Sequence, residues 1–522
     1  RANLAAAESQ EVAQFLENLF EQASPHESKG EQVTAIDLLE LGRERIEALE
    51  GQPKLQAQLM RIMASSSTAL GDLDLSVPML ERALEMMEAE QPPDPVAISQ
   101  VTNNLSEAHR QLGNLDEAEA YQRRTIDLAT AAFGANDDSV AYLIGRLGVV
   151  LFDAGKAEEA IAIEQQALDI MRANGSEESS DAVDIRGNIG NALSRLGRYD
   201  EAEEVLRETV VLSKKVDGEL APNTAIRISN YGLILVRLGR YEEAVAAFED
   251  ALDRGRQVWP EDYDSIAFMT GSKAAALKRL GRMDESLAAY REAAGMTERM
   301  RGKKSLTYVA RMRGVGSVLM DMARFAEAEA VFEDALATAV RLDSEDGNLA
   351  TQLRTFLGQL AVDRGDFAAA QGYLERVKTR GAGQGGSYGA ILDKELGIAL
   401  SEQGKYEDAE PLLLGSLEEQ RSLNGADSTT QLPNLAALAG HYRRAGDLEQ
   451  ALGYAERIRD LAAADPKPLT WAGAMALAEA GHTFKAAGRG DATAAYRSAY
   501  AELERVFGAD DPRVQALAES RE

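Results

Sequence analysis

The chain contains no cysteine, and its 522 residues include only 13 prolines and 6% aromatic residues. The lack of thiols excludes disulfide bonds, thiol catalysis and zinc–thiolate sites. No run of about 18 apolar residues occurs, so no stretch of the sequence is long and apolar enough to cross a bilayer. Basic residues are also few: the chain has 56 Lys and Arg but 86 Asp and Glu, which gives a formal net charge of −30. A field of that sign repels phosphate, which argues against a general nucleic-acid or anionic-membrane surface.

One short pattern returns every 42 residues. Arg195–Ala202 reads RLGRYDEA, Arg237–Ala244 reads RLGRYEEA and Arg279–Ser286 reads RLGRMDES. A fixed period of this length is typical of a solenoid built from repeated units. With one shortening of the period to 39 residues, the turn recurs at eleven positions: Gly71, Gly113, Gly155, Gly197, Gly239, Gly281, Ala323, Gly365, Gly404, Gly446 and Gly488.

Small residues flank the turns at two fixed distances. Glycine, alanine or serine stands seven positions before every turn, and also five positions after every turn except the last, where Thr493 is larger. Two helices approach closely only where neither carries a bulky side chain at the crossing. Each unit is therefore predicted to be a helix, a left-handed glycine turn and a second helix. Because the alternation typical of strands is absent, the predicted fold class is all-α.

This order of a small residue, then Gly-x-aromatic, then alanine resembles the tetratricopeptide repeat, in the 42-residue form of kinesin light chains. The resemblance covers residues 55–508 and implies a right-handed superhelical solenoid of about eleven helix–turn–helix repeats, with capping helices at both ends. Residues 1–54 are expected to form an N-terminal juxtamembrane helix and a degenerate capping hairpin, and residues 509–522 a truncated C-terminal capping helix. The glycine-rich run at 379–389 is predicted to be a soft joint. It lacks the preceding strand and the Lys-Ser/Thr that a phosphate-binding loop needs.

The opening of the chain carries a second resemblance. Gln14–Phe20, Ser24-Pro25, Gly30–Ala35 and Leu38–Ile46 resemble the segment that joins the membrane helix of bacterial receptor-like serine/threonine protein kinases to their tetratricopeptide array. The resemblance implies that a kinase domain and one membrane helix precede this chain, which would then be attached to the bacterial inner membrane, with the periplasmic side favoured. Since the chain begins with Arg1 and has no signal peptide, we expect a soluble fragment of a longer protein. Winged-helix transcriptional regulators also carry such arrays, and a stand-alone repeat scaffold is a further alternative.

The spacing of titratable residues indicates no catalytic or metal-binding constellation. The four histidines, His26, His109, His441 and His482, occupy different offsets in different repeats. The carboxylates are spread over every repeat, as on solvated helix faces, so none can be paired for acid–base work. We therefore expect surface or packing roles for the histidines, and neither a cofactor, a metal nor an enzymatic activity in this part of the protein. A helical-array hydrolase or transferase is the competing class, and a purely structural spacer is a third.

The candidate binding surface is the groove of the expected solenoid. In the family that the chain resembles, the first helices line this groove, with positions about 13, 10, 9, 6, 3 and 2 residues before the turn facing it. Nine residues before the turn stand Asn104, Arg146, Asn188 and Asn230, and six before stands Asn191. An amide offers a donor and an acceptor together, so such a row can hold an extended peptide by its backbone. It resembles the asparagine ladder of kinesin light chains. The alternative is that asparagine merely suits a tight polar helix contact.

A row of cations accompanies the asparagines. Arg195, Arg237 and Arg279 stand two residues before their turns, and Arg110 and Lys278 stand three before. In so acidic a chain they form a local positive stripe suited to a carboxylate or to acidic side chains. The alternative is the helix dipole, which favours a cation in a last turn by about 0.3–1 kcal/mol. The predicted function is a non-catalytic scaffold that binds a peptide or protein partner in the groove, with no nucleic acid and no insertion of this part into a membrane.

Overall fold

The computed structural model describes residues 35–47, 52–379, 386–425, 427–464 and 469–518, together with Glu17, Leu49 and Ser520. All elements within these residues are helices, and no strand occurs among them. Most of the predicted N-terminal helix and the glycine run at 380–385 lie outside the described residues. The chain divides into two compact units, Arg1–Ile234 (unit 1) and Leu235–Glu522 (unit 2).

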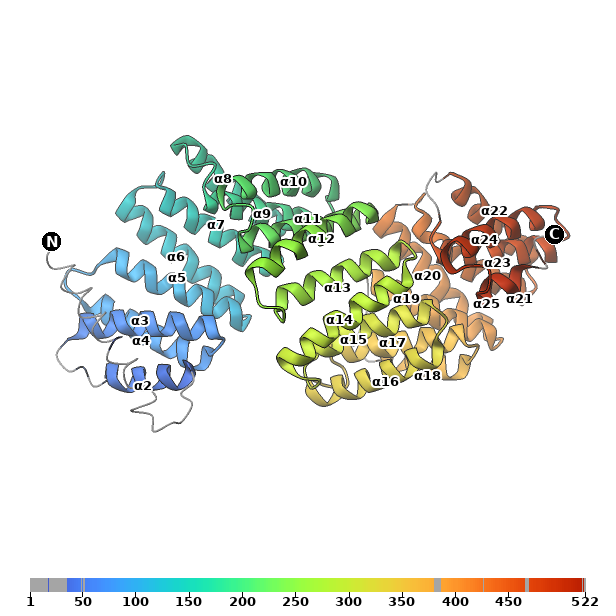
Figure 1. The fold of residues 1–522 in the computed structure, drawn as a ribbon, viewed down its shortest axis with the longest axis horizontal. Helices are drawn as coiled ribbons and strands as arrows, with labels where there is room; N and C mark the ends of the chain where they lie inside the picture. Colours follow the sequence, from blue (N-terminus) through green and yellow to red (C-terminus); the bar gives the residue numbers. More distant parts are fainter. Residues whose placement is uncertain are drawn as a thin grey trace. The chain divides into compact units, whose positions relative to one another are not determined.

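Unit 1 is a series of antiparallel helical hairpins, drawn from blue to green in Figure 1. Each second helix packs against its own first helix, and those that follow the turns at Gly71, Gly113 and Gly155 also pack against the first helix of the next hairpin. The helices are α2 (Ala35–Glu47), α3 (Pro53–Leu70), α4 (Leu73–Ala89), α5 (Pro95–Leu112), α6 (Leu115–Phe133), α7 (Asp138–Asp153), α8 (Ala157–Asn174), α9 (Ser180–Arg195), α10 (Tyr199–Val216) and α11 (Pro222–Arg237), whose end lies in unit 2.

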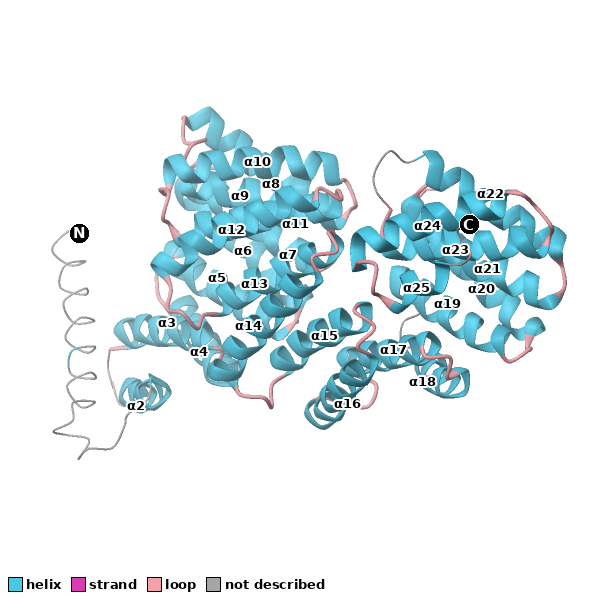
Figure 2. Ribbon diagram, turned by 45° about the vertical axis from the view of Figure 1, so that its right-hand side comes forward, coloured by secondary structure: helices cyan, strands magenta, loops and turns pink. Residues whose placement is uncertain are grey.

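Unit 2 continues the same pattern, and Figure 2 shows that its described elements are again helices joined by loops. The helices are α12 (Tyr241–Val258), α13 (Asp264–Arg279), α14 (Met283–Arg301), α15 (Leu306–Asp321), α16 (Phe325–Leu342), α17 (Asn348–Asp363), α18 (Phe367–Thr379), α19 (Gly386–Glu402), α20 (Tyr406–Asn424), the 3-10 helix η1 (Thr429–Gln431), α21 (Leu432–Ala445), α22 (Leu448–Ala464), α23 (Trp471–Ala486), α24 (Asp491–Phe507) and α25 (Pro512–Ala518). Short α25 places Val514 and Leu517 in the same buried cluster as α23 and α24.

The predicted turns close the hairpins in the left-handed conformation. Gly197, for example, has φ 76°, and its N–H and that of Arg198 donate to the carbonyls of Ser194 and Leu193 at 3.1 and 3.0 Å. These bonds satisfy carbonyl groups that the end of a helix otherwise leaves unpaired. The turn at Ala323 has the same form with φ 56°, and Ala323 is the only residue other than glycine with a positive φ in the described part of the chain.

The small residues before the turns allow the two helices of a hairpin to approach. A Cβ atom added at Gly316 would lie 2.4 Å from the ring of Phe332, and one added at Gly358 would lie 2.5 Å from the side chain of Leu374. Phe332 and Leu374 each stand nine residues after their turn and are fully buried. A bulky residue on the first helix would therefore push a core side chain out of the hairpin.

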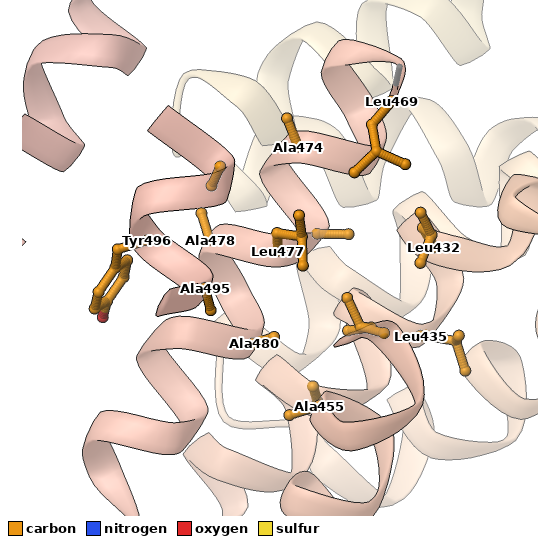
Figure 3. Packing of buried hydrophobic residues seen from close by; sticks show 14 of the residues in the cluster. Leu432, Leu435, Ala455, Leu469, Ala474, Leu477, Ala478, Ala480, Ala495 and Tyr496 are labelled. Carbon is orange, nitrogen blue, oxygen red and sulfur yellow. The ribbon is translucent and has the colours of Figure 1, made fainter. Parts of the chain in front are cut away.

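The cores themselves are built from leucine and alanine, as the low aromatic content suggests. Figure 3 shows this for α21–α24, where Leu435 and Leu477 lie among Ala455, Ala478 and Ala480. All five residues belong to one buried cluster. Alanine allows close helix packing, so it serves here as a spacer between larger side chains.

Glu164 on α8 breaks the packing rule. It stands nine residues after its turn, where Phe332 and Leu374 stand in later repeats, and only 1% of its surface is exposed. Neither carboxyl oxygen has a hydrogen-bond partner of good geometry. Burial raises the pKa of Glu164 to about 8, although the nearby amide of Asn188 opposes that shift. The carboxyl is therefore mostly protonated at neutral pH, because burial disfavours its charged form more than the amide of Asn188 stabilises it.

We expect Ala323→Gly to stabilise the protein. The left-handed conformation costs an L-residue about 1–2 kcal/mol, and glycine avoids this cost while losing about 0.4–1 kcal/mol through the greater freedom of the unfolded chain. The midpoint of thermal unfolding, followed by circular dichroism at 222 nm, should rise slightly. Gly365→Ala is the matched control at the next turn, with φ 75° and open surroundings, and should lower the midpoint. A lower midpoint in both variants would contradict the prediction.

We also expect the burial of Glu164 to make stability fall as pH rises. The folded-state pKa of about 8 lies above the unfolded value of about 4.3. Between these two pKa values Glu164 loses its proton in the unfolded chain and keeps it in the folded chain. The free energy of unfolding therefore falls by about 1.4 kcal/mol for each pH unit. Glu164→Gln should therefore unfold at a higher temperature than the parent at pH 8 and show a smaller difference at pH 5. Glu159→Gln, an exposed change on the same helix, should follow the parent at both values; equal differences for both variants would refute the prediction.

Candidate binding surface on the first helices

Within each unit, the first helices form the inner layer. Successive first helices contact each other directly, as in the pairs α3–α5, α7–α9, α13–α15, α15–α17, α17–α19, α19–α21 and α21–α23. No two successive second helices make comparable contact in the described part of the chain. The layer with the closer spacing lies on the inside of a curved stack, so we call the exposed face of α3, α5, α7, α9 and α11 the inner wall of unit 1.

Charge is divided unequally between the two layers of unit 1. The first helices α3, α5, α7 and α9 contain six basic residues (Lys and Arg) and five acidic residues (Asp and Glu). The second helices α4, α6, α8 and α10 contain seven basic and seventeen acidic residues. The acidity of unit 1 therefore lies on its outer layer. An acidic ligand meets less repulsion at the inner wall than at the outer helices.

An ion-pair network joins α5 and α7 on the inner wall. Arg110 bonds Glu107 at 2.7 Å and Asp153 at 2.6 Å, and Arg146 bonds Glu107 at 2.6 Å. Although burial alone would raise it, the pKa of Glu107 is lowered to about 2 by the hydrogen bonds from Arg110 and Gln111 and by the charge of Arg146. The two predicted cations thus meet here, and two carboxylates that were not predicted match their charge. Glu107 and Asp153 stand six and two residues before their turns, and both offsets are groove offsets. Their place on the inner wall could therefore have been predicted from the sequence.

The predicted asparagines differ in their surroundings. The side-chain nitrogen of Asn104 is buried and makes no hydrogen bond within the described residues. Asn188 lies beside the carboxyl of Glu164 on the preceding helix, so its amide is in contact with a buried group. Asn191 on α9 and Asn230 on α11 are half-buried.

Arg195 and two apolar side chains complete the inner wall. The guanidinium of Arg195 lies 4.8 Å from the centre of the Phe152 ring and donates to the carbonyl oxygen of Phe152 at 2.8 Å. Its side chain is nevertheless exposed, so it presents an oriented cation. Tyr142 and Ile226 each stand thirteen residues before their turn and are 40% and 39% exposed. Sequence reasoning overlooked this pair, although the shared offset marks it.

The other predicted cations lie in unit 2. Lys278 on α13 bonds Asp321 at 2.9 Å and Ser317 at 2.5 Å. Arg237 at the end of α11 and Arg279 at the end of α13 are exposed. Lys278 therefore has a partner inside unit 2, whereas the other two extend from the surface.

The histidines make packing contacts. His109 stacks on Tyr121 with ring centres 5.4 Å apart, and His482 bonds the hydroxyl of Tyr496 at 2.8 Å. His441 bonds Ser401 at 3.1 Å, but both residues are only 2% exposed, so a substrate could not reach this pair. His26 lies outside the described residues. Among the residues that the structure describes, no group of three metal-binding side chains occurs and no helix is long and apolar enough to span a membrane.

Comparison with known proteins identifies the repeat. Models of the tetratricopeptide repeat match residues 97–173, 181–257 and 389–464, and two further models of the same repeat match residues 231–299 and 351–376. A search of curated protein sequences finds no match.

Similar solved structures share low sequence identity with the chain. A putative kinesin light chain with TPR-like repeats from Podosopora anserina is 15% identical and covers 40% of this chain and 98% of its own, with a TM-score of 0.36. The apo form of the quorum sensor NprR from B. thuringiensis is 12% identical over 71% of this chain and 97% of its own, with a TM-score of 0.48. The apo form of RapI is 12% identical over 71% and 99%, with a TM-score of 0.51.

Identities this low bear on the fold alone. The fold of RapI, with its TM-score of 0.51, agrees with the helical hairpins described above. Together the repeat models span more than half of the residues. The chain therefore belongs to the tetratricopeptide repeat proteins and is an all-α solenoid.

Proposed function

We propose that the chain is a non-catalytic scaffold that holds an extended peptide, or an extended segment of a partner protein, on the inner wall of unit 1. The observation that carries the proposal is the unequal charge of the two layers. The first helices carry six basic and five acidic residues, whereas the second helices carry seven basic and seventeen acidic residues. An acidic partner that approaches unit 1 meets less repulsion there than at the second helices.

The side chains of the inner wall support recognition of a peptide backbone. Asn191 and Asn230 each offer a donor and an acceptor, which match the N–H and C=O groups of an extended chain. Tyr142 on α7 and Ile226 on α11 provide exposed apolar side chains. Arg195 is exposed and oriented by Phe152, so it suits a carboxylate of the ligand. The network of Glu107, Arg110, Arg146 and Asp153 is balanced in charge and serves to hold the helices together.

We further propose that this array is the C-terminal interaction region of a membrane-anchored bacterial serine/threonine protein kinase. The support is the resemblance of Gln14–Phe20 and Leu38–Ile46 to the segment that precedes such arrays. Bound partners would then be held near the kinase at high effective concentration, or would shift its conformational equilibrium. The reading frame upstream of Arg1 tests this: a His-Arg-Asp loop, an Asp-Phe-Gly and one apolar stretch of about 20 residues are expected. A winged-helix sequence there would instead indicate a transcriptional regulator. A reading frame without any preceding domain would indicate a stand-alone scaffold.

We expect Asn191→Ala combined with Asn230→Ala to weaken peptide binding at least tenfold. Each lost hydrogen bond to a ligand costs about 0.5–1.5 kcal/mol. Peptides selected from a random-sequence display library on the parent protein supply the probe, and fluorescence anisotropy measures their affinity. Asn188 stays unchanged because its amide lies beside Glu164, so that its removal would also alter the core.

The matched control changes amides outside the inner wall. Gln165 and Gln166 are exposed side chains on the second helix α8. Gln165→Ala with Gln166→Ala should leave the affinity unchanged, and both double variants should keep the helical content and unfolding midpoint of the parent. Equal affinity of the parent and the asparagine variant would remove the inner wall as the binding surface.

A further inference from the structure

Unit 2 contains a contact between helices that are five repeats apart. Val506, near the end of α24, lies against the turn that joins α13 to α14. A Cβ atom added at Gly281 in this turn would lie 3.2 Å from Cγ1 of Val506. Repeats in a solenoid ordinarily contact only their neighbours, so the period of the sequence does not account for this contact.

Two aromatic side chains extend the contact. Phe507 follows Val506, and Trp471 begins α23 with its ring centre 6.4 Å from that of Phe507. All three residues pack against the buried cluster of α14–α17, whose members include Met283 and Leu287. The end of the chain therefore covers apolar surface of the first repeats of unit 2.

Arg513 at the start of α25 fixes the aromatic pair in place. Its guanidinium lies 3.6 Å from the centre of the Phe507 ring and 5.9 Å from that of Trp471. Asp511 holds the same guanidinium through two bonds of 2.9 Å. A cation stacked on an aromatic face and anchored by a carboxylate has a defined orientation. Arg513 also lies within electrostatic range of Asp363 at the end of α17.

The contact is weaker in kind than the interfaces between neighbouring repeats. Trp471, Val506 and Phe507 are each only partly buried, whereas alanines and leucines such as Ala328 and Leu353 in the adjoining hairpins are fully buried. The contact also forms between a turn and a helix end, not along two helices. Segments joined by few and partly buried apolar contacts open at a lower free-energy cost than the rest of a fold.

We propose that Trp471, Val506, Phe507 and Arg513 form a clasp that closes unit 2 onto the α13–α14 turn and opens reversibly. The occupant of the apolar surface around Gly281 and Met283 is thus the C-terminal hairpin of the same chain. Opening exposes this surface and separates the two ends of unit 2 without unfolding any hairpin. The clasp lies within unit 2, so it does not depend on the site proposed for unit 1.

A cysteine pair tests whether the clasp closes in solution. The Cβ atom of Val506 lies 3.7 Å from the Cβ position at Gly281, which matches the spacing of about 3.8 Å across a disulfide. Because the chain has no cysteine, Gly281→Cys with Val506→Cys introduces the only two thiols. Mild oxidation should give an intrachain disulfide in the monomer, seen as faster migration on a non-reducing gel. Gly365→Cys with Val506→Cys, at a turn with open surroundings, should not cross-link.

The same protein tests whether the clasp opens. If the contact opens reversibly, the disulfide should slow amide hydrogen exchange of Gly281–Met283 by about tenfold or more relative to the reduced form. Val506→Asp should speed that exchange and raise the radius of gyration in solution scattering, whereas Val211→Asp, at a valine of α10 that is 65% exposed, should do neither. Failure of the first pair to form an intrachain disulfide would show that the clasp is not closed. Equal exchange in the oxidised and reduced forms would show that it does not open.

Discussion

The close crossing of two helices before each turn is the constraint on which the rest of the structure depends. At Gly316 and Gly358 there is no room for even one carbon atom, because Phe332 and Leu374 fill the space opposite them. The side chain nine residues after the turn can be large only because the residue seven positions before the turn is small. Both distances must be kept for the hairpin to close, which explains why the sequence repeats at a fixed period.

The division into layers follows from the stacking of these hairpins. First helices contact one another from repeat to repeat, while second helices lie further apart and are more open to solvent. Carboxylates are hydrated most easily on the open layer, which agrees with their excess on α4, α6, α8 and α10. Glu164 is the exception, because it lies at the crossing itself and is held neutral there by burial.

Much of the fold was predictable because its causes are local. The turns, the small residues and the second-helix starts each depend on residues within a few positions of one another, and the left-handed turn at Ala323 was placed by the period even without glycine. The contact of Val506 with Gly281 was not predictable, since it depends on the summed curvature of five repeats, to which every interface contributes a little. The exposed pair Tyr142 and Ile226 stands at an expected groove offset, but an apolar side chain at such an offset does not by itself show whether it is buried or exposed.

The cations at the ends of the first helices separate into two groups by their partners. Arg110 bonds Asp153 and Lys278 bonds Asp321, and in both pairs the cation stands three residues before its turn and the acid two before the next turn. One structural rule, an ion pair between neighbouring first helices, therefore accounts for both cations. At Arg195 the same rule fails, because Phe152 stands where the earlier repeat would carry the cation, and Arg195 occupies the position of the acid. A ligand carboxylate on the inner wall of unit 1 would thus meet Arg195 in preference to Arg110. Arg110 already bonds Glu107 and Asp153, whereas the exposed guanidinium of Arg195 bonds a backbone carbonyl and no carboxylate among the described residues.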